Sequence, residues 1–120
     1  MATVLIVDDS PTETHKLTSM LEKNGYSVLT ASTGEAGVAE AKQSNPDVVL
    51  MDIVMPGLNG FQATRQLSKG SQTAHIPVII VTTKDQETDR VWGLRQGAKA
   101  YLTKPIGEKQ LLDAISDAMN

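Results

Sequence analysis

Three short runs of apolar residues constrain the fold of this chain more than any other feature: Val4–Val7, Val48–Met51 and Val78–Val81. Each run is continuously apolar and does not alternate with polar residues, which is typical of a strand that is covered on both faces of its sheet. Two weaker strand candidates are Tyr26–Thr30 and Ala100–Thr103. Together these five segments predict a sheet whose strongest strands are buried.

Segments with helical spacing lie between the strand candidates. Ser10-Pro11-Thr12-Glu13 combines an N-cap serine, a proline at the first helical position and a glutamate that would complete a capping box. Ser32-Thr33-Gly34-Glu35 repeats the capping-box pattern. Three further helices are predicted around residues 61–67, 85–96 and 111–119. In the fourth helix we expect these residues to face the core: Val91, Leu94 and Ala98.

The alternation of strand and helix, repeated about five times, predicts an α/β fold with a parallel sheet. The 120 residues suit one domain, and no linker, low-complexity tract or run of like charges divides them. We therefore expect a single domain over residues 1–120, present as a monomer.

Composition excludes several classes of function. Lys and Arg number 11 against 14 Asp and Glu, and the net charge of −3 argues against a nucleic-acid-binding protein and gives no support to an anionic membrane surface as partner. The apolar runs are too short for a signal peptide or a membrane span. The absence of cysteine excludes disulfides, thiol nucleophiles and cysteine–metal sites. We expect a cytoplasmic protein.

The polar residues that follow the strand candidates carry the chemistry of the chain. In an open parallel sheet, ligands bind at the carboxyl ends of the strands. Three carboxylates, one hydroxyl and one ammonium group are therefore expected at one edge of the sheet. They belong to Asp8, Asp9, Asp52, Thr82 and Lys104.

Three carboxylates at one edge indicate a bound cation. Two carboxylates ~4 Å apart repel each other by about 4 kcal/mol at an effective dielectric constant of ~20. The available ligands are oxygen atoms, because cysteine is absent and both histidines, His15 and His75, are expected on the surface away from the strand ends. This donor set favours Mg²⁺.

Four motifs occur in order at the ends of the predicted strands: VLIVDDS at residues 4–10, MDIVMPGLNG at 51–60, VTT at 81–83 and YLTKP at 101–105. With these motifs the whole chain resembles the receiver domain of bacterial two-component response regulators. The resemblance implies a flavodoxin-like, doubly wound, five-stranded parallel sheet in the order 2-1-3-4-5, with five helices.

The resemblance also implies a mechanism. Asp52 would be the phosphoacceptor, and the donor would be a phosphohistidine on a sensor histidine kinase. Asp8 and Asp9 would hold Mg²⁺ together with Asp52 and the backbone carbonyl of Val54. The protein would then be a signalling domain rather than an enzyme with an external substrate.

Further roles follow from the same resemblance. Thr82 would bind a phosphoryl oxygen, and Lys104 would pair with the acceptor carboxylate and then with the phosphoryl group. The Lys104-Pro105 peptide bond would be cis. Phosphorylation would move Thr82 and Tyr101, and a downstream protein would read the change on the surface around Tyr101. Independently of the resemblance, Trp92 lies about 100° around the fourth predicted helix from Val91. It is therefore expected at the edge of that partner surface, with simple packing over neighbouring helical residues as the alternative.

Two other classes of protein fit the residues less well. A phosphatase with an aspartyl-phosphate intermediate, as in the haloacid dehalogenase family, needs an acidic residue two positions after the nucleophile, where this chain has Val54. A flavodoxin-like FMN carrier needs a phosphate-binding first loop, which Asp8 and Asp9 would repel. Thr83 departs from the small residue that receiver domains often carry there, and its side chain would narrow access to the phosphoryl group.

The pathway is indicated by a finer resemblance. Residues 61–67 (FQATRQL) and 82–89 (TTKDQETD) resemble single-domain regulators of type IV pilus twitching motility, although chemotaxis regulators share the remaining motifs. No residues follow the last predicted helix, so we expect no attached output domain. Two roles stay open, a diffusible messenger and a sink for phosphate from a shared kinase.

Overall fold

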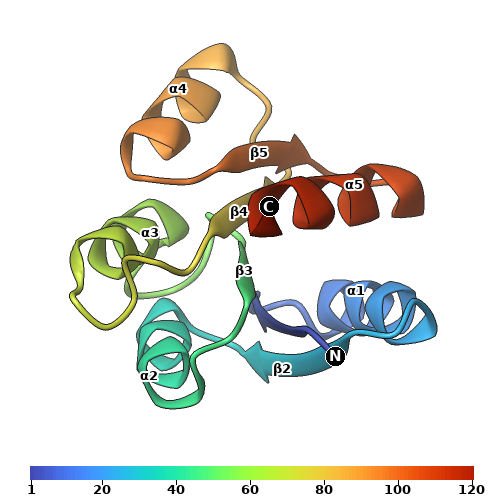
Figure 1. Cartoon of the computed structure of the whole chain (residues 1–120). Coiled ribbons are helices and arrows are strands. Elements are labelled where there is room, and N and C mark those ends of the chain that lie inside the picture. The colour runs from blue at the N-terminus through green and yellow to red at the C-terminus, as the bar shows by residue number, and fades with distance from the viewer.

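The computed structural model describes all 120 residues as alternating strands and helices (Figure 1). The elements are β1 (Thr3–Val7), α1 (Pro11–Lys23), β2 (Ser27–Ala31), α2 (Gly34–Ser44), β3 (Val48–Met51), α3 (Gly60–Lys69), β4 (Val78–Thr82), α4 (Glu87–Arg95), β5 (Ala100–Thr103) and α5 (Glu108–Met119). The strands are parallel and ordered β2-β1-β3-β4-β5, which confirms the predicted flavodoxin-like order. None of the helices is both long enough and apolar enough to cross a membrane.

Different helices cover the two faces of the sheet, so the central strands are buried on both sides (Figure 1). On one face, α1 and α5 pack over Val4 and Ile6. On the other face, α2 and α3 pack over Leu5 and Val7. Successive side chains of a strand point to opposite faces, and the uninterrupted apolar run of β1 therefore contributes to both cores.

Helix α4 buries a different face from the one predicted. Val91 and Leu94 are 40% and 36% exposed, so the prediction that they face the core is wrong, although Ala98 is buried as expected. The buried residue of α4 is Gly93, where a Cβ would lie only 2.7 Å from Cδ1 of Ile80. Close approach of the helix backbone at this glycine sets the rotation of α4, and the apolar side chains beside it turn outward.

The start of α2 also differs from the prediction. Thr33 is the N-cap residue, and its hydroxyl accepts a hydrogen bond from the backbone N–H of Ala36 at 3.0 Å. Ser32 is therefore outside the helix, and Glu35 does not complete a capping box with it. The Glu35 carboxylate instead accepts a hydrogen bond at 3.2 Å from the backbone N–H of Leu58, in the loop between β3 and α3. A tertiary contact replaces the local one.

We predict a large loss of stability from one large-to-small change and almost none from another. Leu50→Ala, in the central strand β3, should lower the free energy of unfolding by about 2–5 kcal/mol, because it leaves a cavity between two packed layers. Val91→Ala, on the exposed side of α4, should change it by less than about 0.5 kcal/mol. Urea unfolding followed by circular dichroism measures both. A loss above ~1 kcal/mol for Val91→Ala would show that the Val91 side chain packs in the core after all.

Candidate functional site

The hydrogen-bond ladder of the sheet continues past the strand ends and positions the site. The backbone N–H of Asp52 donates to the carbonyl of Val7 at 2.9 Å, just beyond β3 and at the end of β1. The backbone N–H of Lys104 donates to the carbonyl of Thr82 at 2.7 Å, which joins the ends of β4 and β5 in the same way. The backbone itself thus gathers the predicted residues at one edge of the sheet.

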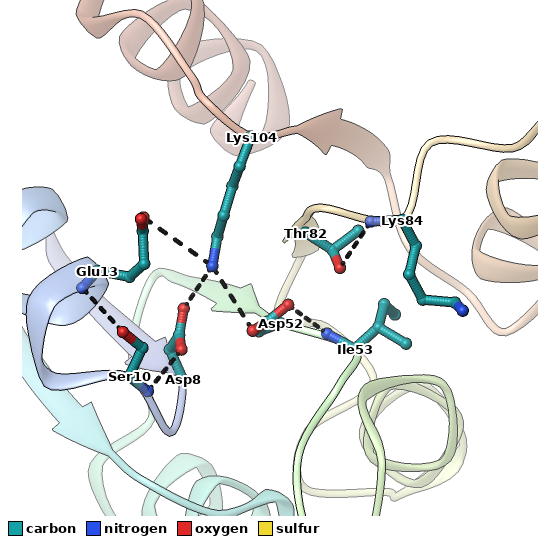
Figure 2. A network of polar contacts seen from close by, with 8 residues as sticks. All are labelled: Asp8, Ser10, Glu13, Asp52, Ile53, Thr82, Lys84 and Lys104. Atoms are coloured by element: carbon teal, nitrogen blue, oxygen red, sulfur yellow. Dashed lines mark hydrogen bonds and ion pairs between the residues drawn. The ribbon is translucent and has the colours of Figure 1, made fainter.

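Lys104 is the centre of the side-chain network (Figure 2). Its ammonium nitrogen Nζ lies 2.8 Å from Oδ2 of Asp8, 3.6 Å from Oδ2 of Asp52 and 4.0 Å from Oε2 of Glu13. The Lys104 side chain is 7% exposed, and those of Asp8 and Asp52 are 2% and 12% exposed. Water screens these charges poorly, so the ion pairs are stronger than their surface counterparts.

The other carboxylate oxygens of the two buried aspartates bind backbone groups. Oδ1 of Asp8 accepts from the N–H of Ser10 at 2.9 Å, and Oδ1 of Asp52 accepts from the N–H of Ile53 at 2.8 Å. Both acidic side chains are therefore fixed from two sides, by Lys104 and by the loop that follows their own strand. This holds one oxygen of Asp52 next to the ammonium group.

Burial and charge shift the pKa values of the acceptor and the lysine. Burial raises the pKa of Asp52 above its usual value, the charge of Lys104 opposes this, and the charge of Asp8 adds to it. Burial alone would lower the pKa of Lys104, but the hydrogen bond to Asp8 and the charge of Asp52 raise it above its usual value. Lys104 is thus a cation at neutral pH, whereas ionisation of Asp52 lowers the stability of the folded protein.

The acidic cluster has the donor set of a magnesium site. Carboxylate oxygens of Asp8, Asp9 and Asp52 all lie within 4.8 Å of one another. Asp9 is exposed, so one side of the cluster is open to solvent. Three hard oxygen donors around one open side suit Mg²⁺, which binds few carboxylates and keeps waters that a phosphate can replace. Val54, whose side chain is 60% exposed, lies in the loop that follows Asp52.

Gly60, which the sequence analysis did not assign to the site, holds the loop after Asp52 in place. A Cβ at Gly60 would lie 2.0 Å from the backbone oxygen of Asp52, and the N–H of Gly60 donates to the carbonyl of Ile53 at 3.0 Å. No side chain fits where Gly60 contacts the backbone of Asp52 and Ile53. The signal in the sequence was the glycine that directly follows Asn59, the N-cap residue of α3.

Thr82 and Tyr101 are both joined to the backbone of Lys84. Thr82 is fully buried, and its hydroxyl accepts from the N–H of Lys84 at 3.4 Å. The hydroxyl of Tyr101 donates to the carbonyl of Lys84 at 2.8 Å. Burial, together with the charges of nearby carboxylates, raises the pKa of Tyr101 to about 12. One residue therefore connects the end of β4 with the aromatic side chain of β5.

The two histidines lie outside the acidic cluster, as expected. His75 is exposed and bonds Asn45 at 2.7 Å. His15 is exposed on α1, yet it lines a groove of about 670 Å³ between α1 and α2 that also reaches Asp8 and Asp9. The His15 ring is not among the clustered ligand atoms, and both histidines are on the surface as expected.

Two other predictions concern the Lys104-Pro105 peptide bond and the position of Trp92. The Lys104-Pro105 peptide bond is cis, as predicted. Trp92 is 50% exposed on α4, which agrees with its expected place on the surface. Its contact with a partner stays a prediction.

Asp52→Asn should make the metal-free protein more stable at pH 7. The raised pKa of Asp52 means that the folded state loses stability as the pH rises through that pKa, because a buried carboxylate must ionise. The uncharged amide avoids this loss. The gain should shrink as the pH falls through the raised pKa and vanish only well below the ordinary value of 3.8, where the carboxylate is protonated in both states.

Urea unfolding in a chelator at several pH values measures this gain. Asp85→Asn, in the exposed segment before α4, is the control for an equal change in net charge. A less stable Asp52→Asn protein at pH 7 would mean that pairing with Lys104 outweighs burial.

Comparisons with known proteins agree with this geometry. Residues 4–116 match the family model of the response regulator receiver domain. The chain is 71% identical over 116 residues to Protein PilH of Pseudomonas aeruginosa, covering 97% of this chain and 96% of that protein. It is 40% identical over 114 residues to the response regulator PleD of Caulobacter vibrioides, of which the match covers 25%.

Solved structures show the same fold. The chemotaxis protein CheY4 of Vibrio cholerae superposes with a TM-score of 0.91 at 31% identity over 98% of both chains. The receiver domain of the sensor histidine kinase PA1611 from Pseudomonas aeruginosa, with a magnesium ion coordinated in its active site cleft, superposes with a TM-score of 0.91 at 29% identity, covering 98% of this chain and 97% of that one. The parallel sheet, the acidic edge with its lysine and these matches show that the chain belongs to the response regulator receiver domain family, the signalling domain of two-component systems.

Proposed function

We propose that this chain is a stand-alone response regulator that accepts a phosphoryl group on Asp52 from a phosphohistidine of a sensor kinase. One observation carries the proposal: the Asp52 carboxylate lies at the end of a central strand, inside an acidic cluster and 3.6 Å from the ammonium group of Lys104. The match to Protein PilH spans 96% of that protein, which supports a response regulator made of a receiver domain alone.

The transfer is a substitution at phosphorus. An oxygen of Asp52 attacks the phosphorus atom, the P–N bond to the histidine ring breaks, and its electron pair stays on the ring nitrogen. The protein contributes mainly position and charge, because phosphoryl transfer needs little covalent help. The N–H of Ile53 and the ammonium group of Lys104 hold the carboxylate while its oxygen turns to the donor.

Lys104 and Thr82 act on the phosphoryl oxygens in this proposal. The ammonium group of Lys104 is already directed at Asp52 and can move to an oxygen of the attached phosphoryl group. The hydroxyl of Thr82, buried at the end of β4, can donate a second hydrogen bond to it. Fixed positive charge and donors stabilise the charge that develops during transfer.

Mg²⁺ would be held by Asp8, Asp9 and Asp52, with the backbone carbonyl of Val54 as a further ligand. Receiver domains bind Mg²⁺ in this cleft, as the PA1611 receiver structure illustrates. When bound, the ion neutralises charge on the phosphoryl oxygens. The exposed Asp9 leaves an open path for its entry.

The residues around the site do not support an external phosphatase. Val54 stands where an acidic residue would protonate a leaving group, and this exposed apolar residue has no proton to give. The activity expected of the chain is therefore its own phosphorylation and its own slow dephosphorylation.

The output surface is proposed around Tyr101 and Trp92. Movement of Thr82 towards the phosphoryl group would break its hydrogen bond with Lys84, to which Tyr101 is also bonded. The Tyr101 ring lies against Gly93 of α4, where a Cβ would be 2.9 Å from Cδ2 of the ring. A shift of this ring thus alters the support of α4, and a downstream protein would read the altered α4–β5–α5 face.

The proposed pathway is the control of pilus-driven twitching or of chemotaxis-type motility. The finer sequence resemblance and the 71% identity to Protein PilH support it. The lifetime of the phosphorylated form distinguishes the two open roles: seconds favour a phosphate sink for a shared kinase, and minutes with a captured partner favour a messenger.

Asp52→Asn should abolish phosphorylation, because the amide keeps the shape of the side chain but is not a nucleophile. The protein is incubated with labelled acetyl phosphate and Mg²⁺, and the bound label is counted. Label at the wild-type level in the variant would disprove the assignment of the acceptor.

The same assay tests the metal. Asp9→Ala removes an exposed ligand and should slow labelling and weaken Mg²⁺ binding strongly. His15→Ala is the matched control, because it changes a side chain of the same groove that lies outside the ligand cluster. Equal losses in the two variants would place the metal elsewhere.

Trp92→Ala should weaken capture of the downstream partner without slowing phosphorylation of Asp52. The half-exposed ring offers a large apolar contact at the edge of the proposed surface. Trp92 is the only tryptophan, so its fluorescence should also change when Mg²⁺ and beryllofluoride are added. An unchanged spectrum together with unimpaired capture would leave Trp92 as a packing residue.

A further inference from the structure

Glu13 does not have the role that its position in the sequence predicts. A capping box would direct its carboxylate back to the backbone N–H of Ser10. That N–H donates to Oδ1 of Asp8 instead, at 2.9 Å, while the Ser10 hydroxyl still accepts from the N–H of Glu13 at 3.3 Å. The Glu13 side chain is therefore released from the cap, and Figure 2 shows it turned towards Lys104.

The carboxylate of Glu13 competes for a cation that the acceptor needs. Oε2 of Glu13 lies 4.0 Å from Nζ of Lys104, on the side of α1, and Oδ2 of Asp52 lies 3.6 Å from the same nitrogen. The Glu13 side chain is 32% exposed, so its charge is only partly screened by water. Unlike the other carboxylates around Lys104, Glu13 follows no strand and is not in the cluster of possible metal ligands.

A phosphoryl group on Asp52 would add negative charge within reach of Lys104. The lysine must then move towards the new oxygens, and every carboxylate that attracts it from elsewhere opposes this movement. Glu13 also repels the incoming anionic donor directly. Both effects act in the same direction.

We propose that Glu13 is a positioning residue that restrains Lys104 through the ion pair between its Oε2 and the lysine Nζ, and thereby limits the rate at which Asp52 is phosphorylated. The inference rests on the proposed phosphorylation of Asp52. It assigns to the first turn of α1 a side chain that slows this phosphorylation.

The main test compares two variants with the same change in net charge. Glu13→Gln should be phosphorylated by acetyl phosphate and Mg²⁺ about three- to tenfold faster than the wild type at low ionic strength. Glu22→Gln, on the exposed last turn of the same helix, should match the wild type. The gain should shrink as salt is added, because the effect is electrostatic and part of it reaches through solvent. Intact-mass measurement follows the phosphorylated fraction with time.

A second readout needs neither metal nor phosphate. In the metal-free protein, the Cε–Hε NMR resonance of Lys104 should shift in Glu13→Gln and stay in place in Glu22→Gln. A purely structural role of Glu13 in α1 would change the unfolding midpoint but leave this resonance and the salt dependence unchanged.

The outcomes separate the inference from the proposed function. If the wild type is phosphorylated on Asp52 but Glu13→Gln is phosphorylated no faster than Glu22→Gln, the role of Glu13 is disproved and the proposed function is not. A wild type that takes no label, or an Asp52→Asn variant that takes as much, overturns the proposed function. An unmoved Lys104 resonance in Glu13→Gln overturns the inference in either case.

Discussion

The site depends on one buried cation among like charges. The parallel sheet places the carboxylates of Asp8 and Asp52 at the same edge, and Asp9 brings a third within 4.8 Å. At such distances each pair repels by about 4 kcal/mol at an effective dielectric constant of ~20. Lys104, itself nearly inaccessible to solvent, offsets this repulsion by lying between the two buried carboxylates. Burial remains the main reason that the pKa of Asp52 is raised, and three carboxylates around one ammonium group leave a net negative charge that would attract a divalent cation.

The same arrangement connects the site with a distant surface. Lys84 bonds the hydroxyl of Thr82 through its N–H and the hydroxyl of Tyr101 through its carbonyl, and its ammonium group lies 3.9 Å from Asp89 on α4. Helix α4 meets the sheet at Gly93 and has no side-chain hydrogen bond capping its start. Lys84 therefore connects the end of β4 with α4 through direct contacts. Helix α4 also carries the exposed apolar side chains.

Much of this could be predicted from the sequence, because it depends on local order along the chain. Apolar runs such as Val4–Val7 specify strands buried on both faces, and helices between them require parallel pairing. Residues that follow parallel strands must share an edge of the sheet, so the proximity of Asp8, Asp52 and Lys104 follows from the order of the strands and helices along the chain. The strand order is different, since it came from the resemblance to a family and not from any pattern in the residues.

Which of several possible partners each side chain contacts depends on the packing of the folded chain. Val91 and Leu94 have the spacing of a core face, but close backbone packing at Gly93 rotates α4 and exposes them. Glu13 has the spacing of a capping box, yet Asp8 takes its acceptor position and Glu13 turns to Lys104. The strands, the helices and the chemistry at the sheet edge can be predicted from the amino-acid sequence, because these follow from neighbours along the chain. The rotation of α4 and the partner of Glu13 depend on contacts between distant segments, which local periodicity does not encode.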